Sequence, residues 1–356
     1  MNAPQVGDRI SEYILIELLG AGSFGQVWKA RHHVWQDEFV AIKVPTDSQF
    51  VRNLQKEGCT IHGLRHRNIV RAIGLDPYGP IPYLVMEFVD GLSLAAWVSR
   101  FARGLPVQAA QRILIGILHA LDHAHSSGVI HRDIKPANIL IAGGADRPID
   151  SVGVDDVKVT DFGLGLAGQI TANSILQSGS LVAEDGRSIS GTLAYMSPEQ
   201  RDGGTADARS DLYSVGIVLF EMLTGERPSG SDMPSHLREG LPSWVDPVFA
   251  RLYTRRDRRF ASAADVIRAI EPAAARGVVA PTPPPIPESY AAPRRRPDAR
   301  ACPSCHEPTE PGDNFCILCG AQLVGEIRRC PSCGGYPDSG DQFCIHCGFA
   351  LTARMG

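Results

Sequence analysis

The cysteines of this 356-residue chain are distributed unevenly, and their distribution limits how the chain can fold. Only Cys59 precedes residue 300, whereas the other eight of the nine cysteines lie between Cys302 and Cys347. A secreted disulfide-bonded protein would spread its bridges through the main domain. We therefore expect a large body without disulfides and a small metal-binding tail, in a reducing compartment.

The cysteine-rich tail is an internal repeat with a period of 28 residues, and each copy reads C-x2-C-x10-C-x2-C. Two cysteines separated by two residues turn both thiolates toward one ion, and two such pairs complete a tetrahedral Zn²⁺ site. Because Cys319 and Cys330 are also separated by ten residues, spacing alone leaves the pairing open, and the repeat favours one site per copy. Disulfide bonds and a rubredoxin-like iron site are the alternatives. The predicted ligands of two structural zinc ions are Cys302, Cys305, Cys316 and Cys319 in the first copy and Cys330, Cys333, Cys344 and Cys347 in the second.

Residues 11–271 form the body of the chain and read as one mixed α/β domain. Short runs with apolar alternation predict strands early in this domain, and longer runs with helical periodicity follow. Residues 272–300 change character, and seven prolines lie between residues 277 and 300, which is typical of an extended linker. The predicted strands are Tyr13 to Leu19, Gln26 to Ala30, Phe39 to Val44 and Ile81 to Phe88, and the predicted helices are Arg52 to Leu64, Ala109 to His125, Asp211 to Leu223 and Ala261 to Ile270.

A glycine-rich loop, Gly20-Ala21-Gly22-Ser23-Phe24-Gly25, lies near the start of the body. Glycines allow a tight turn whose backbone N–H groups approach phosphate oxygens, where a Cβ would obstruct. The competing interpretation is a dinucleotide-binding fingerprint, which requires a helix after the loop. Here a β-type segment, Gln26 to Ala30, follows. The loop is therefore predicted to be a hairpin turn that contacts phosphates.

Val40-Ala41-Ile42-Lys43 is a predicted strand that ends in a lysine. A lysine in such a place is often an edge residue with its ammonium group in water. A buried lysine needs a counter-ion, and Glu57 can supply one from the helix that follows. We expect Glu57 to hold Lys43 while Lys43 contacts phosphate.

Two polar segments follow in the second half of the body. The segment His131-Arg132-Asp133-Ile134-Lys135-Pro136-Ala137-Asn138 places a base, two cations and a metal-ligand amide within eight residues of loop. The run from Val157 to Thr160 reads as a strand that ends at Asp161-Phe162-Gly163. Such a triplet alone is often only a turn, but an aspartate at a strand end before glycine also suits a metal ligand.

These segments, in this order, resemble the signature motifs of protein kinases, most closely the eukaryotic-like serine/threonine kinases of bacteria. The resemblance covers residues 11–271 and continues in the segment from Gly191 to Glu199, where Ser197 replaces the commoner alanine, a change that should matter little. It implies an α+β fold with a β-rich N-terminal lobe and a helical C-terminal lobe. The tail resembles a double zinc ribbon, which implies two ribbons after the linker, at residues 301–324 and 329–352.

The resemblance implies a role for each polar residue of the proposed reaction. Asp133 should accept the proton of the substrate hydroxyl, and Lys135, which is typical of serine/threonine kinases, should neutralise the γ-phosphate of ATP. Lys43 should hold the α- and β-phosphates. Asn138 and Asp161 should bind Mg²⁺ or Mn²⁺, which prefer oxygen ligands.

Other residues are expected to support these groups. Asp211 matches the buried aspartate that braces the catalytic loop of the family, and Arg259 matches the arginine that pairs with Glu199. His131 and Phe162 are assigned to packing and not to chemistry.

The family's nucleotide site supplies the remaining assignments. Val27, Ala41 and Leu140 should sandwich adenine, Met86 should be the gatekeeper, and the backbone from Glu87 to Val89 should bind the purine edge. The full predicted ATP-binding set is Leu19, Gly20, Ala21, Gly22, Ser23, Phe24, Gly25, Val27, Ala41, Lys43, Glu57, Met86, Glu87, Val89 and Leu140.

Arg132, beside the catalytic aspartate, implies control by phosphorylation, because an unpaired cation there needs an anionic partner. Autophosphorylation in a transient dimer is the expected route. Thr192 is expected to contact Asp133 and Lys135 instead. The candidate sites of modification are Thr171, Ser174, Ser178, Ser180, Ser188 and Ser190.

One segment departs from the family pattern. The interval from Asn138 to Asp161 is longer than usual, and the excess lies in Ala142 to Asp156, which is polar and contains glycine. A surface hairpin extension is the simplest interpretation.

Composition excludes several other classes of protein. A net charge of −4 lacks the basic excess of a nucleic-acid or membrane-surface binder. The tail and linker, residues 277–356, carry seven arginines, no lysine and eight acidic residues, so a protein partner for the ribbons is favoured over nucleic acid. No leader and no run of about 18 apolar residues is present, and a cytoplasmic protein without membrane association is expected.

The expected function is therefore an ATP-dependent serine/threonine protein kinase that acts on protein substrates, itself included. The alternative is a pseudokinase scaffold that binds nucleotide and partners without catalysis. Pseudokinases usually lack one of the residues that match Lys43, Asp133 and Asp161, and all three are present here.

Overall fold

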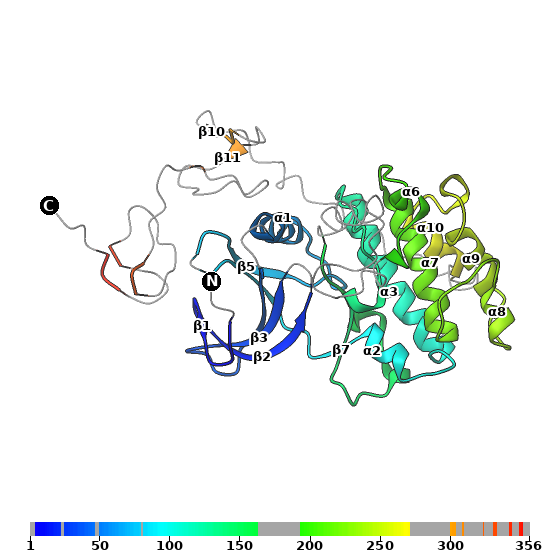
Figure 1. Cartoon of the computed structure of the whole chain (residues 1–356), viewed down its shortest axis with the longest axis horizontal. Coiled ribbons are helices and arrows are strands. Elements are labelled where there is room, and N and C mark those ends of the chain that lie inside the picture. The colour runs from blue at the N-terminus through cyan, green and yellow to red at the C-terminus, as the bar shows by residue number, and fades with distance from the viewer. Residues whose placement is uncertain are drawn as a thin grey trace, which may run out of the picture. The chain divides into compact units, whose positions relative to one another are not determined.

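The computed structural model describes residues 4–22, 25–46, 50–79, 81–162 and 193–270, and short pieces of the tail at 300–303, 308–309, 323, 330–332, 342–343 and 349–351. The chain divides into two compact units. The N-terminal unit contains residues 1–59, 74–86 and 278–356, and the C-terminal unit contains residues 60–73 and 87–277. Figure 1 shows a sheet with one helix in the first and mainly helices in the second, which confirms the predicted β-rich and helical lobes.

The N-terminal unit is built on a six-stranded sheet with the strand order β1-β2-β3-β4-β6-β5. The first four strands pair in antiparallel fashion. Their many valines, isoleucines and aromatic residues favour extended backbone. The strands are β1 (Arg9–Ile10), β2 (Tyr13–Ala21), β3 (Gln26–His32), β4 (Phe39–Val44), β5 (Ala72–Asp76) and β6 (Tyr83–Glu87).

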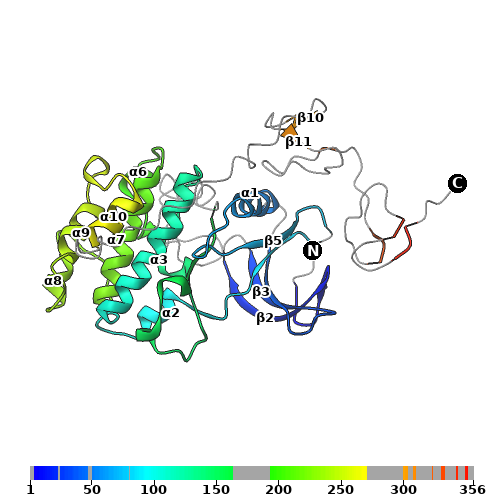
Figure 2. The same ribbon diagram turned by 180° about the vertical axis from the view of Figure 1, so that it is seen from behind.

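The two faces of this sheet differ because successive side chains of a strand point to opposite sides. Trp28 of β3 and Ile42 of β4 are cross-strand partners and belong to a buried apolar cluster. Their neighbours Val27 and Lys43 are also partners, so they point to the other face. The helix α1 (Val51–His62) lies beside the sheet in Figures 1 and 2.

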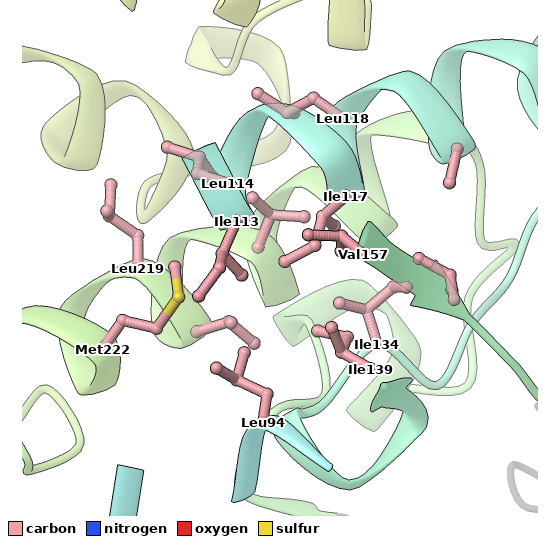
Figure 3. Close-up of a cluster of buried hydrophobic side chains, with 14 of the residues drawn as sticks. Leu94, Ile113, Leu114, Ile117, Leu118, Ile134, Ile139, Val157, Leu219 and Met222 are labelled. Atoms are coloured by element: carbon pink, nitrogen blue, oxygen red, sulfur yellow. The ribbon is translucent and has the colours of Figure 1, made fainter. Parts of the chain in front are cut away.

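The C-terminal unit is mainly helical, and its longest helices are almost entirely apolar on their packed faces. Ile113 and Ile117 of α3 lie one helical turn apart and pack in the same core as Leu219 and Met222 of α7 (Figure 3). The helices are α2 (Leu94–Ser99), α3 (Val107–Ser126), α6 (Pro198–Arg201), α7 (Ala208–Thr224), α8 (Pro234–Leu237), α9 (Val245–Leu252) and α10 (Ala263–Ile270). In the described part of the chain, no helix is both long and apolar enough to cross a bilayer.

The extension from Ala142 to Asp156 connects two strands of a small antiparallel sheet, β8 (Ile139–Ala142) and β9 (Val157–Val159), to which β7 (Gly91–Ser93) adds a third strand. The expectation of a polar surface hairpin is incomplete, because Ile149 and Val152 are buried in the main core. Arg112 of α3 also donates from Nε to the Val152 carbonyl at 2.5 Å and from Nη2 to the Asp150 carbonyl at 2.7 Å. The extension is therefore packed into the C-terminal unit.

The described pieces of the tail contain two short antiparallel contacts. β10 (Arg300–Ala301) pairs with β11 (Pro308–Thr309), on either side of the first C-x2-C pair in the sequence. Phe343 forms a bridge with Ala350, on either side of the last pair. The structure therefore pairs residues that flank the first and the last C-x2-C segments.

Candidate active site

A buried ion pair joins β4 to α1 in the N-terminal unit. Lys43 Nζ lies 2.8 Å from Glu57 Oε1, and the exposed fractions of the two residues are 6% and 0%. The pair forms because β4 directs Lys43 to the face of the sheet opposite the Trp28 cluster, while α1 carries Glu57. Buried charges are costly unless they are paired, so the arrangement has the close counter-ion that the sequence predicted.

The glycine-rich loop is the turn of the β2–β3 hairpin, as predicted. Ala21 pairs with Gln26 across the two strands, and the Gly22 N–H donates to the Gly25 carbonyl at 2.8 Å. A Cβ on Gly25 would lie only 2.5 Å from the Val44 carbonyl oxygen, so this position requires glycine. Because an antiparallel strand follows the loop, the dinucleotide-binding alternative does not apply. Ser23 and Phe24 lie outside the described residues.

Several residues predicted to contact ATP surround Lys43 on its face of the sheet. Ala41 precedes Lys43 by two residues on β4, and Val27 is the cross-strand partner of Lys43, so the three side chains share one face. Ala41 and Met86 are buried, whereas Leu19, at the end of β2, is exposed. The sheet therefore presents a mainly apolar surface beside one buried ammonium group.

In the C-terminal unit, a loop after α3 holds the carboxylate of Asp133 between two donors. Lys135 Nζ donates to Asp133 Oδ2 at 2.8 Å, and Asn138 Nδ2 donates to the same oxygen at 3.1 Å. Asn138 Nδ2 also donates to the Asp133 carbonyl at 2.9 Å. Asp133, Lys135 and Asn138 are thus brought together as predicted, with the carboxylate partly open to solvent.

Asp211 at the start of α7 anchors this loop from within the core. Its Oδ1 accepts the Arg132 N–H at 2.7 Å and its Oδ2 accepts the His131 N–H at 2.9 Å. The bracing role expected of Asp211 agrees with this geometry. Arg132 has a φ of +68°, a left-handed conformation that costs about 1–3 kcal/mol in a non-glycine residue and persists only where its surroundings hold it.

His125 is a partner of Asp211 that the sequence did not single out. Its Nε2 lies 2.8 Å from Asp211 Oδ2, at the end of α3. The two residues are 86 positions apart, and the only sequence signal is a polar residue in the last turn of an apolar helix. Three groups therefore converge on one buried carboxylate.

His131 packs against the strand end that carries Asp161. Its Nε2 donates to the Thr160 carbonyl at 2.9 Å, which leaves Nδ1 to accept the Asp133 N–H at 3.3 Å. Its ring centroid is 4.5 Å from that of Phe162. These contacts support the expected packing roles of His131 and Phe162.

Asn138 and Asp161 are the expected metal ligands, and their chemistry fits a hard divalent cation. Both amide hydrogens of Asn138 have acceptors nearby in Asp133, so the amide oxygen is the atom left to bind a metal. Asp161 lies two residues after the end of β9 and has a φ of +64°. Backbone strain of this kind is common where a side chain is held for function.

The Glu87 side chain takes part in the structure of the C-terminal unit. Its Oε1 accepts from Lys158 Nζ at 2.9 Å and from the Arg71 N–H at 3.1 Å, and the Glu87 N–H donates to the Arg71 carbonyl at 2.9 Å. The segment from Glu87 to Val89 is expected to bind the purine edge, and within it the Glu87 N–H already has a hydrogen-bond partner in the Arg71 carbonyl. Leu140, a further expected contact, lies in β8.

Glu199 and Arg259 form the predicted ion pair through two parallel hydrogen bonds. Arg259 Nη1 is 2.6 Å from Glu199 Oε1, and Nη2 is 2.9 Å from Oε2. Burial acts to raise the pKa of Glu199, but hydrogen bonds from Arg259 and Ser210 outweigh it and lower the pKa to about 2. The pair ties α6 to the segment before α10.

Several sequence predictions fall on residues that the structure does not describe. They are Gly163, Thr192, the six candidate phosphorylation sites, and Cys305, Cys316, Cys319, Cys333, Cys344 and Cys347. Of the predicted zinc ligands, Cys302 and Cys330 are described, and both are buried. With only these two cysteines described, the described part of the tail contains no group of three or more side chains that could bind a metal. Thiolate sulfur is the donor that Zn²⁺ takes in closed structural sites, so both residues fit that metal.

Comparison with known proteins gives matches for both parts of the chain. The family model for the protein kinase domain matches residues 13–247, and that for the double zinc ribbon matches residues 302–348. Serine/threonine-protein kinase PknB of Mycolicibacterium smegmatis is 38% identical over 264 residues, which are 70% of this chain and 37% of that relative. Serine/threonine-protein kinase PrkC of Bacillus subtilis is 36% identical over 250 residues, 67% of this chain and 35% of that relative. The chain thus spans little more than a third of the length of these relatives.

Solved structures show the same fold. The kinase domain of Mycobacterium tuberculosis PknI matches with a TM-score of 0.57 at 23% identity, covering 75% of this chain and 98% of that domain. Rad53 (residues 1–466) in complex with AMP-PNP matches with a TM-score of 0.54 at 27% identity, covering 73% and 66%. Fold, motif order and the match over residues 13–247 agree: this chain belongs to the protein kinase family and carries a C-terminal segment that matches the double zinc ribbon family.

Proposed function

We propose that the chain is an active serine/threonine protein kinase that transfers the γ-phosphate of ATP to hydroxyl groups of proteins, itself included. The observation that carries the proposal is the geometry of Asp133. Its carboxylate is held by Lys135 and Asn138, in a loop that Asp211 anchors to the core. The relatives named as serine/threonine-protein kinases support the same class of acceptor.

Phosphoryl transfer depends mostly on positioning and on neutralising charge, and the loop has groups for both. Asp133 accepts the proton of the substrate hydroxyl and orients its oxygen. We assign Lys135 to neutralising the γ-phosphate, and its position 2.8 Å from Asp133 supports this assignment. The hydrogen bonds from Lys135 and Asn138 limit the rotation of the Asp133 carboxylate.

In the N-terminal unit, we assign Lys43 to the α- and β-phosphates and Glu57 to holding Lys43 in place. The hairpin turn from Gly20 to Gly25 contacts phosphate through its backbone N–H groups. Val27, Ala41 and Met86 are assigned to adenine. Rad53, which has a similar fold, was crystallised with the adenine nucleotide AMP-PNP.

In the C-terminal unit, Leu140 is assigned to adenine and the Val89 backbone to the purine edge. Asn138 and Asp161 are assigned to Mg²⁺ or Mn²⁺. The bound metal would neutralise phosphate oxygens and orient them. The residues themselves supply an amide oxygen and a carboxylate, held by the hydrogen bonds of Asn138 and by the backbone of Asp161.

The regulatory proposal rests on Arg132. Among the described residues, its guanidinium has neither an ion pair nor a hydrogen bond, while its backbone is held tightly. A phosphate on a residue between Thr171 and Ser190 would supply the missing anion. Phosphopeptide mapping of active protein tests this, and phosphotyrosine as the only product would contradict the assignment to serine and threonine.

For the tail, we propose two structural zinc ions, one in each four-cysteine set, and a role in docking a protein partner. The proposed domains are the kinase at 11–271, the linker at 272–300 and the ribbons at 301–324 and 329–352. The acidic balance of the tail argues against nucleic acid as its partner.

The deciding experiment incubates the purified chain with γ-labelled ATP and Mg²⁺ and follows label into the chain and into a generic basic protein. Label on serine or threonine is the expected result. Nucleotide binding without transfer, under conditions in which the chain is folded, would contradict the proposal and favour the pseudokinase scaffold.

A further inference from the structure

Two buried polar side chains at α6 have no task in the proposed reaction. Ser197 precedes the helix and Gln200 lies within it, and their exposed fractions are 0% and 1%. Burying polar side chains is costly unless their hydrogen bonds are satisfied. The bonds of these two lead to the loop that carries Asp133.

Gln200 makes hydrogen bonds in two directions. Its Oε1 accepts from the Ser197 hydroxyl at 2.9 Å and from the Ser197 N–H at 3.3 Å. Its Nε2 donates to the Arg132 carbonyl at 3.0 Å. The orientation of the amide follows from these partners, because a backbone N–H only donates and a carbonyl only accepts.

The Arg132 carbonyl belongs to the peptide group that joins Arg132 to Asp133. The other end of this group, the Asp133 N–H, donates to His131 Nδ1 at 3.3 Å. Because a peptide group is planar, contacts at both ends fix its rotation. That rotation sets the direction in which the Asp133 side chain leaves the backbone. Gln200 therefore holds one of the two ends that determine where the carboxylate points.

We propose that Gln200 is a positioning residue: oriented by Ser197, it holds the peptide group before Asp133 and so aims the catalytic carboxylate. The inference rests on the proposed role of Asp133. The proposal also assigns a role to Ser197, because its hydroxyl is a second donor that keeps the Gln200 amide in this orientation. The expectation that serine in place of alanine matters little is thereby revised. A shift of α6 would therefore reach Asp133 through Gln200.

The substitution Gln200→Glu separates this role from simple capping of α6. A carboxylate keeps an acceptor for both donors of Ser197, and glutamate is a normal partner in a capping box. It cannot donate to the Arg132 carbonyl and places an acceptor against it. In the full chain we expect kcat to fall about 10- to 100-fold, the effect of a small misplacement. KM for ATP should change less than about twofold, because the substitution leaves nucleotide contacts in place.

Two further variants sharpen the test. Ser197→Ala should lower kcat less than Gln200→Glu, because the Ser197 N–H still orients the amide. The double variant should lose no more than Gln200→Glu alone, since the hydroxyl acts through Gln200. The control variant is Asp202→Asn, which replaces a carboxylate with an amide at an exposed position two residues after Gln200. It should keep kcat unchanged. If Gln200→Glu is folded and its kcat equals that of Asp202→Asn, the proposal is overturned.

Hydrogen–deuterium exchange decides the matter even if the chain transfers no phosphate and the proposed function fails. The amides of Arg132 and Asp133 should exchange faster in Gln200→Glu than in the wild type or Asp202→Asn. Exchange in α9 should be equal in all three proteins, which excludes general loosening of the fold. Equal exchange at Arg132 and Asp133 in the three proteins shows that Gln200 does not position the loop.

Discussion

Two lysine–carboxylate ion pairs, one in each unit, have equal N–O distances but differ in their exposure to solvent. Lys43 Nζ is 2.8 Å from Glu57 in the N-terminal unit, and Lys135 Nζ is 2.8 Å from Asp133 in the C-terminal unit. The side chains of the first pair are 7% and 0% exposed, whereas those of the second are 20% and 17% exposed. The first pair joins a strand to a helix, and the second lies within one loop.

The difference shows two ways of placing charge for a reaction. Regular secondary structure positions Lys43 and Glu57, and each is the buried counter-ion of the other. Asp133 has a weaker partner, because solvent screens its pair with Lys135. Its precision comes instead from buried groups outside the pair, above all Asp211. Loss of a partner should therefore harm stability at the first pair and mainly the rate at the second.

The largest expected effect is on the rate after Asp133→Asn. Loss of the base and of its orientation should lower phosphoryl transfer by about two to four orders of magnitude. Thermal unfolding should change little, because the loop remains bound to Asp211. The matched control is Asp146→Asn, the same exchange at an exposed position of the extension, which should transfer phosphate like the wild type. Turnover of Asp133→Asn at the wild-type rate would remove the catalytic assignment.

The comparison is tested directly by Lys43→Ala and Lys135→Ala. Both variants should lose phosphoryl transfer, but only the first should lose much stability. Lys43→Ala removes one partner of a buried ion pair, which costs about 3–5 kcal/mol of unfolding free energy. Lys135→Ala removes a partly exposed pair, worth about 1 kcal/mol or less. Urea unfolding of both variants measures the difference, and equal destabilisation would show that burial does not distinguish the pairs.

A third ion pair extends the comparison within the C-terminal unit. The pKa of Glu199 in the folded chain, about 2, lies below its ordinary value of 4.5. The unfolded chain therefore binds more protons between these values, so stabilisation by Glu199 is complete above pH 4.5 and is lost as the pH falls toward 2. The difference in unfolding free energy between the wild type and Glu199→Gln should shrink over that range. A difference that stays constant as the pH falls would contradict the pairing with Arg259.

The smallest expected effect on catalysis comes from removing the tail. Metal analysis of the full chain should give two zinc ions, one for each set of four among the eight tail cysteines. Segments of this size cannot fold on apolar burial alone, so metal supplies their folding free energy. A chain that ends at Glu271 should contain no zinc.

The truncated chain should still phosphorylate a generic substrate, because every residue assigned to the reaction precedes the linker. As a control that leaves the chain intact, the same phosphorylation is measured after zinc has been removed from the full chain by a chelator. If either treatment abolishes transfer to generic substrates, the ribbons belong to the catalytic unit and are not an independent docking module.

Much of the fold was predictable from patterns that repeat along the chain. The strand from Phe39 to Val44 was predicted with its observed bounds, and the predicted helix Ala109 to His125 lies within α3. Apolar periodicity reports such elements because each one buries a face of its own. Shorter elements, such as β7 and α2, were missed, since three to six residues carry too little periodicity to stand out.

The sequence by itself determined the class of the protein and was sufficient to propose its reactive residues. Asp133, Lys135 and Asn138 lie within one short loop, and Glu57 follows Lys43 by 14 residues, so spacing along the chain was sufficient to propose them together. Only the tertiary structure decided what holds them. Arg132 meets Asp211 across 79 residues and Gln200 across 68 residues, and Ile149 of the extension joins the core of α3. Hydrogen-bond partners so far apart leave no local pattern, because they meet only when the helices between them pack around one core.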